Sequence, residues 1–99
     1  MHNMTILSLL KVKGHSMEPG IKTNSRVLVS GIYFLFGSNK IGDVVAFKMK
    51  NELFIKRIKR VQGDKFFVAG DNKNDSLDSR TFGEIEKMDI IGKVIFKLP

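Results

Sequence analysis

Cysteine is absent from this 99-residue chain, which excludes disulfide bonds and zinc sites built on thiolates. A long hydrophobic run is absent too. The N-terminal apolar stretch from Met4 to Leu10 is interrupted by Thr5 and Ser8, and it is far shorter than the roughly 20 residues that a membrane-spanning helix needs. We therefore expect a chain without a transmembrane segment, either cytoplasmic or bound peripherally to a membrane.

Acidic residues are scarce relative to basic ones: the chain has 10 Asp and Glu residues and 17 Lys and Arg residues, which gives a net charge of +7. Such an excess favours contact with nucleic acid, anionic lipid headgroups or acidic proteins, and it is equally typical of a solvated lysine-rich surface. Aromatic residues are not regularly interleaved with the basic ones, as they are in many nucleic-acid-binding barrels. We therefore expect no nucleic-acid partner.

Hydrophobic residues alternate with period two along much of the chain, which predicts strands. The expected strands lie near residues 6–13, 25–36, 43–49, 53–62, 65–70 and 90–97. A single helical turn is expected within residues 83–89. The chain reverses direction too often for parallel pairing, so the predicted fold is mainly β, a small antiparallel sheet or partly closed β-barrel. With 42% apolar residues, positions 1–99 are expected to form one domain with one small core.

Only two histidines are present, and neither is suited to activate a serine. His2 lies near the N-terminus. His15 precedes Ser16 directly, so its side chain would point to the other face of an extended segment. A Ser-His-Asp triad is therefore disfavoured, and the base for Ser16 in the segment GHSMEPGI (residues 14–21) must be sought among the lysines.

A lysine accepts a proton only when burial disfavours its charged form, which moves its pKa from about 10.4 towards about 7 or 8. In the segment LFIKRIKRV (residues 53–61), strand alternation places Phe54 and Ile58 beside Lys56 on one face. Lys59 lies in a more polar setting. Lys56 is therefore the best candidate for a buried base, and the alternative is an edge-strand lysine whose amine reaches water.

Four segments in this order resemble signal peptidase I and its relatives, the serine proteases with a Ser/Lys dyad. They are GHSMEPGI, which resembles the nucleophile box with Ser16; RVLVSGIYFLFGSNKIGDVVAFK, the strand pair after it; FIKRI, the general-base box with Lys56; and GDNKNDSLDSRTFG, the last box. The segment IIGKVIF resembles the final strand of the family. The resemblance covers nearly the whole chain, and it is far more specific than one Ser-Met-x-Pro match.

The resemblance implies a mechanism without cofactor or metal. Neutral Lys56 would accept the proton of Ser16 as the serine oxygen attacks the scissile carbonyl, and it would then activate the water that hydrolyses the acyl-enzyme. Ser76 would donate or accept a hydrogen bond with Lys56 and orient it. Some members carry an oxyanion serine at the position of Gly14, so the backbone N–H of Ser16 is the expected oxyanion donor here.

The resemblance also implies a set of supporting residues, which pack beside the nucleophile, stiffen or free the turns, or pair with one another: Gly14, Met17, Pro19, Arg57, Gly70, Asp71, Asp78, Arg80 and Gly83. Asp71 would pair with Arg57 behind Lys56. Asp78 would pair with Arg80 and brace the loop that carries the orienting serine.

Two departures from a typical signal peptidase bear on the substrate. Only 14 positions separate Lys56 from Gly70, where typical members carry a long cap domain, and only 15 residues precede Ser16, where they carry one or two membrane anchors. We expect a minimal catalytic core, similar in size to the proteases that mature nickel superoxide dismutase by removing a leader. The apolar segment IYFLF (residues 32–36) could contact a membrane interface or pack inside the protein.

The expected function is that of a monomeric serine endopeptidase that removes an N-terminal leader or signal peptide from a precursor protein, cutting after a small residue. Peripheral contact with a membrane would fit this role. Two alternatives stay open: a catalytically inactive signal peptidase-like binding domain, and a fragment of the LexA-like type, which shares the dyad but cleaves itself.

Overall fold

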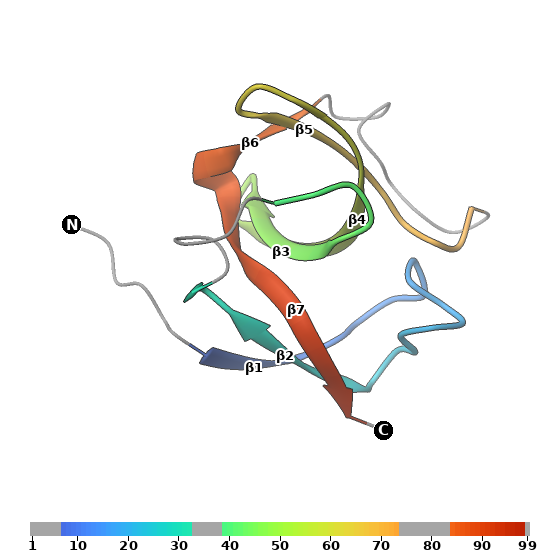
Figure 1. Ribbon diagram of the computed structural model, residues 1–99. Helices are drawn as coiled ribbons and strands as arrows, with labels where there is room; N and C mark the ends of the chain where they lie inside the picture. Colours follow the sequence, from blue (N-terminus) through green and yellow to red (C-terminus); the bar gives the residue numbers. More distant parts are fainter. Residues whose placement is uncertain (1–6, 33–38, 74–83, 99) are drawn as a thin grey trace.

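The computed structural model describes residues 7–32, 39–73 and 84–98, and these form one antiparallel sheet (Figure 1). The strands are β1 (Leu7–Lys11), β2 (Arg26–Ser30), β3 (Val44–Met49), β4 (Glu52–Gln62), β5 (Lys65–Ala69), β6 (Ile85–Glu86) and β7 (Ile90–Leu98). Their order across the sheet is β1-β2-β7-β3-β4-β5-β6, so β1 and β6 form its two edges. The predicted mainly β, antiparallel fold is confirmed, and the sheet is not closed.

Each expected strand has a counterpart, and the structure adds one that was not expected. Strand β2 ends at Ser30, earlier than the expected 25–36, and residues 33–38 lie outside the described ranges. The expected helical turn is present as a single turn of 3-10 helix, η1 (Lys87–Asp89). The two-residue strand β6 precedes it and pairs with β5. Two residues are too few to show an alternating pattern, so only the tertiary contact with β5 defines this strand.

Strands β3 and β4 form a hairpin with a two-residue turn at Lys50 and Asn51. Both residues have positive φ, 51° and 64°, as in the turn type whose twist matches that of the flanking strands. The register places Val45 opposite Lys56. The register of the hairpin therefore determines that Val45 of β3 lies next to the candidate base, Lys56.

The sheet carries a hydrophobic core on each face. The β5 core consists of Val45, Phe47, Ile58, Phe66, Val68, Ile85 and Ile90. The β2 core consists of Val12, Met17, Ile21, Val27, Val29 and Ala46. Neighbouring side chains on β3 point to opposite faces, so Val45 enters one core and Ala46 the other. The β2 core includes three residues from the connection between β1 and β2, and this buried anchorage holds that connection against the sheet.

Strand β7 joins the two halves of the sheet and extends between them in Figure 1. Its first residues pair with β3 and its later residues pair with β2, with a register shift in each pairing. Gly92 lies close to β2: a Cβ added there would lie 2.6 Å from the carbonyl oxygen of Ser30 and 2.8 Å from Cγ1 of Val29. Only glycine permits this approach.

The described part of the chain contains no helix of the length and apolar character that crossing a membrane requires.

Candidate active site

Ser16 lies in the connection between β1 and β2, which spans residues 12–25 and is organised by its own backbone. The N–H of Val12 donates to the Ser25 carbonyl at 2.8 Å, and the N–H of Asn24 donates to the Val12 carbonyl at 2.7 Å, so the β1–β2 pairing continues into the connection. The N–H of Ile21 donates to the Met17 carbonyl at 2.9 Å. Ser16 is half-buried within this hydrogen-bonded loop.

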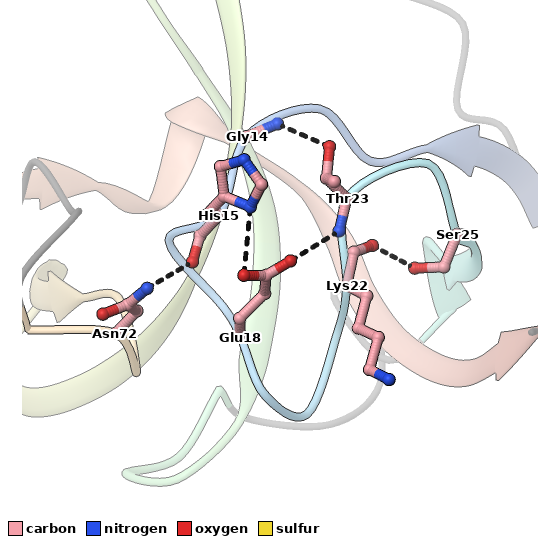
Figure 2. A network of polar contacts seen from close by, with 7 residues as sticks. All are labelled: Gly14, His15, Glu18, Lys22, Thr23, Ser25 and Asn72. Atoms are coloured by element: carbon pink, nitrogen blue, oxygen red, sulfur yellow. Dashed lines mark hydrogen bonds and ion pairs between the residues drawn. The ribbon is translucent and has the colours of Figure 1, made fainter.

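Glu18 ties the two sides of the loop together (Figure 2). One carboxylate oxygen accepts a hydrogen bond from the N–H of Thr23 at 3.2 Å, and the other lies 3.0 Å from Nδ1 of His15. The hydrogen bond from His15, followed by that from Thr23, lowers the pKa of Glu18 below its ordinary value. The imidazole of His15 therefore faces Glu18, which fits the prediction that it is not the base for Ser16.

Gly14 adopts a φ of +91°, a backbone conformation that residues with a side chain rarely take. Its N–H donates to Oγ1 of Thr23 at 3.1 Å. A serine at this position, as in some signal peptidases, would be strained in this loop. The conformation of the loop thus gives a physical reason for the glycine at residue 14.

Met17 and Pro19 follow the candidate nucleophile. The Met17 side chain is 2% exposed and belongs to the β2 core, so it fixes the backbone next to Ser16. Pro19 is exposed and follows a cis peptide bond from Glu18. Met17 thus anchors the loop next to Ser16.

Lys56 is buried, with 3% of its surface exposed, in the interior strand β4. Phe54 and Ile58 precede and follow it on the same face, and Val45 lies opposite it on β3. Ile58 and Val45 are fully buried members of the β5 core. Lys56 is therefore not an edge-strand lysine whose amine reaches water. Burial of this extent disfavours the charged form of an amine, which is what a lysine base requires.

Ser16 and Lys56, 40 positions apart in sequence, line the same cavity of about 290 Å³. Its walls come from two stretches of chain and are mainly apolar: Leu10, Lys11, Val12, Lys13, Ser16 and Met17 on one side, and Leu53, Phe54, Ile55 and Lys56 on the other. A larger hollow of about 630 Å³ on the loop contains neither candidate residue, and its lysines, Lys22 and Lys97, are exposed. The smaller cavity is therefore the candidate site.

The cavity lies where strand pairing stops on both sides. Because the Val12 backbone bonds towards Ser25, antiparallel geometry directs the backbone groups of Lys11 and Lys13 the other way, to the outer edge of β1. Across the cavity, β5 pairs with β4 only from Arg57 onward. An extended peptide placed in the cavity could therefore add to the edge of β1 as a further strand.

Arg57, the residue after Lys56, forms a bidentate ion pair with Asp71. Nε of Arg57 donates to Oδ1 of Asp71 at 2.9 Å, and Nη2 donates to Oδ2 at 2.8 Å. The hydrogen bonds from Arg57 lower the pKa of Asp71 from its ordinary 3.8, and those to Asp71 raise the pKa of Arg57. Nη1 of Arg57 also donates to the Gly42 carbonyl at 2.7 Å. The segment after β5 is thus held to the residue that follows Lys56.

Asn72 connects the same segment to the nucleophile loop. Its N–H donates to the Ser16 carbonyl at 2.8 Å. Its Nδ2 donates to the His15 carbonyl at 3.0 Å, as Figure 2 shows. Residues 71 and 72 therefore link the strand of Lys56 to the loop of Ser16. Sequence reasoning did not single out Asn72, although its side-chain amide, directly after Asp71 in the last box, is a signal of loop-to-loop bonding.

We expect Asp71→Asn to destabilise the protein by about 1 kcal/mol at neutral pH, because it leaves the Arg57 guanidinium without its carboxylate. The lowered pKa of Asp71 means that the ion pair contributes fully above pH 3.8, and that this contribution is lost as the pH falls through the still lower folded pKa. Urea unfolding at pH 7 and pH 2.5 measures the difference, which should shrink at the acidic pH.

The matched control is Asp64→Asn, at an exposed carboxylate in the turn before β5. It should leave the free energy of unfolding unchanged within about 0.5 kcal/mol. Equal effects of the two substitutions at pH 7 would contradict a structural role for the Arg57–Asp71 pair.

Four residues predicted for the last box lie outside the described ranges: Ser76, Asp78, Arg80 and Gly83. Gly70 is described and is buried. Within residues 7–32, 39–73 and 84–98, no three His, Asp or Glu side chains gather closely enough to hold a metal ion.

A half-buried serine and a buried lysine that line one apolar cavity, next to a free strand edge, are features of a peptidase centre. Comparison with known proteins agrees with this class. The family model described as Peptidase S24-like matches residues 4–95, and the chain belongs to this family.

Curated relatives include signal peptidase IB of Staphylococcus aureus (strain Mu50), 27% identical over 93% of this chain and 78% of the relative. Signal peptidase I of Leptolyngbya laminosa is 24% identical over 87% of this chain and 66% of the relative. The predicted resemblance to signal peptidase I is confirmed, and the protein is a peptidase of the signal peptidase I and S24 type. The Staphylococcus alignment spans 148 positions, more than this chain has residues, so the relative carries inserted residues that are absent here.

Proposed function

We propose that this protein is a serine endopeptidase that removes a leader or signal peptide from precursor proteins, with Ser16 as nucleophile and Lys56 as general base. The observation that carries the proposal is the burial of Lys56, 3% exposed, in the lining of the same cavity as Ser16. A buried amine is the base that a serine without a histidine needs.

The proposed reaction has two halves. In the first, the neutral amine of Lys56 takes the proton of Ser16 while the serine oxygen bonds to the scissile carbonyl carbon, and the proton passes to the leaving amine as the peptide bond breaks. In the second, Lys56 takes a proton from water, which attacks the acyl-enzyme and releases the new carboxyl end. The N–H of Ser16 would donate to the oxyanion, and Ser76 would orient the amine.

The walls of the cavity suggest how the substrate is read. A peptide that adds to the edge of β1 directs every second side chain towards the same face as Leu10 and Val12. These two residues line the cavity from the β1 side and contact the β2 core. A cavity of about 290 Å³ that must also hold the peptide backbone leaves room only for small side chains. Two small residues separated by one, Ala-x-Ala, are therefore the expected sequence before the cut.

The substrate class follows from the relatives, which are named as signal peptidases. A precursor with an N-terminal leader or signal peptide presents an extended, accessible segment of the kind that such a cavity requires.

The test is cleavage of two synthetic leader peptides that differ only before the cut, Ala-x-Ala and Leu-x-Leu, by the purified full chain. We expect mass spectrometry to find a single cut after the second alanine and no cut in the leucine peptide. The intact mass of the protein is followed in the same samples. A shortened protein with both peptides intact would support the self-cleaving alternative, and an unchanged protein with both peptides intact would support the inactive one.

A further inference from the structure

Two lysines, Lys11 and Lys13, alternate with apolar residues along one wall of the candidate cavity. Lys11 ends β1 and Lys13 lies two residues further, where the backbone bonds of Val12 to Ser25 and Asn24 continue the extended pairing. Both lysines are exposed and line the cavity, whereas Leu10 and Val12 alternate with them and pack against the β2 core. Strand geometry therefore places the two ammonium groups on one face of this edge.

Among the residues that the structure describes, no carboxylate forms an ion pair with Lys11 or Lys13. The ion pairs within the described residues use other cations, such as Lys65 with Glu86 and Lys93 with Asp43. Arg26 lies directly opposite Lys11 on β2, and it adds a further positive charge to the same stretch of the sheet. The edge that would receive the substrate thus carries two cations, with a third on the neighbouring strand β2.

A peptide strand on the edge of β1 has side chains that alternate between the same two faces as those of residues 10–13. The side chains that enter the cavity share the face of Leu10 and Val12, so the residue between them shares the face of Lys11 and Lys13. Neighbouring strands bring such side chains within reach of one another, and opposite charges there are favourable while like charges are unfavourable.

We propose that the protein selects leader peptides with Asp or Glu between the two small residues before the cut, and that Lys11 and Lys13 are the specificity-determining residues. The inference rests on the proposed peptidase function and specifies its substrate. The ion pairs between the acidic peptide residue and these two lysines form at the surface, so each contributes modestly to binding. An acidic residue is therefore expected to raise kcat/KM about 3- to 10-fold over lysine at the same position of the peptide. The ratio should fall as salt screens the charges.

The experiment compares three leader peptides, Ala-Asp-Ala, Ala-Ala-Ala and Ala-Lys-Ala, with the wild type and the charge-swap variant Lys11→Glu/Lys13→Glu. The measured quantity is the ratio of kcat/KM for the Asp and Lys peptides within each protein, so that a general change in activity cancels. We expect a ratio above about 3 in the wild type and below 1 in the variant.

The matched control is Lys40→Glu/Lys87→Glu, which makes the same change in net charge at two exposed lysines that do not line the cavity. It should keep the wild-type preference. Equal rates for the Asp and Lys peptides in the wild type, or an acidic preference that survives the swap at Lys11 and Lys13, would overturn the inference while cleavage of Ala-Ala-Ala upholds the peptidase function. No cleavage of any peptide by the wild type would overturn both. If the swap variant does not fold, Lys11→Gln and Lys13→Gln should each lower the ratio.

Discussion

Ser16→Ala and Lys56→Met are each expected to lower kcat/KM for an Ala-x-Ala leader peptide by at least about 10³-fold. The first change removes the attacking oxygen. The second removes the group that takes its proton, and it keeps most of the side-chain volume. Because nucleophile and base act as a unit, the double variant should be no less active than either single variant.

Stability separates a catalytic role of Lys56 from a structural one. Lys56 is 3% exposed, so its amine carries a desolvation cost, and methionine fills about the same space without a charged group. We therefore expect Lys56→Met to be at least as stable as the wild type in urea unfolding while it is inactive. A variant that is inactive and also unfolded would not support a role as base, whereas full activity in a folded variant would remove the dyad.

Two control substitutions match these changes in residue type. Lys59→Ala alters an exposed lysine of the same strand, and Ser8→Ala alters a half-buried serine of β1 that does not line the cavity. Both should keep kcat/KM within about 3-fold of the wild type. The pH profile adds an independent check: activity should disappear as the pH falls through the pKa of the base, and the proposed role requires this pKa to lie below the 10.4 or so of a solvated lysine.

Gly92→Val is expected to destabilise the protein by about 2–4 kcal/mol, the largest effect on stability that we predict. A Cβ at Gly92 would lie 2.6 Å from the carbonyl oxygen of Ser30, which belongs to the backbone of β2 and cannot swing aside as a side chain can. Strand β7 would have to move away from β2, and the contacts that join the two halves of the sheet would weaken. The midpoint of urea unfolding measures the effect.

Gly20→Ala is the control for this change. The Cβ added at Gly20 would lie 3.8 Å from the carbonyl oxygen of Met17, an ordinary van der Waals distance. Its free energy of unfolding should stay within about 1 kcal/mol of the wild type, with a small gain allowed by the lower entropy of the unfolded chain. If Gly92→Val unfolds at the wild-type midpoint, the close approach of β7 and β2 is not a constraint on this protein.

Sequence pattern was sufficient for the local features of the fold and the site. Alternation of apolar and polar residues located six of the seven strands, because in strands such as β1 and β5 one face is more buried than the other. The same alternation put Phe54 and Ile58 beside Lys56, and the structure buries that lysine. The family resemblance added the pairing of Arg57 with Asp71, two residues that do form an ion pair.

The tertiary structure decided everything that depends on which strands are neighbours. It placed β7, the last strand in the chain, between β2 and β3, and it made Gly92 a point of close approach. It also brought the loop of Ser16 and the strand of Lys56 to one cavity, with Asn72 bonded to the loop. A period-two pattern shows which face of a strand is buried but not what buries it. Which residues far apart in sequence come into contact depends on how the two cores pack on the sheet. That packing forms only when the chain folds.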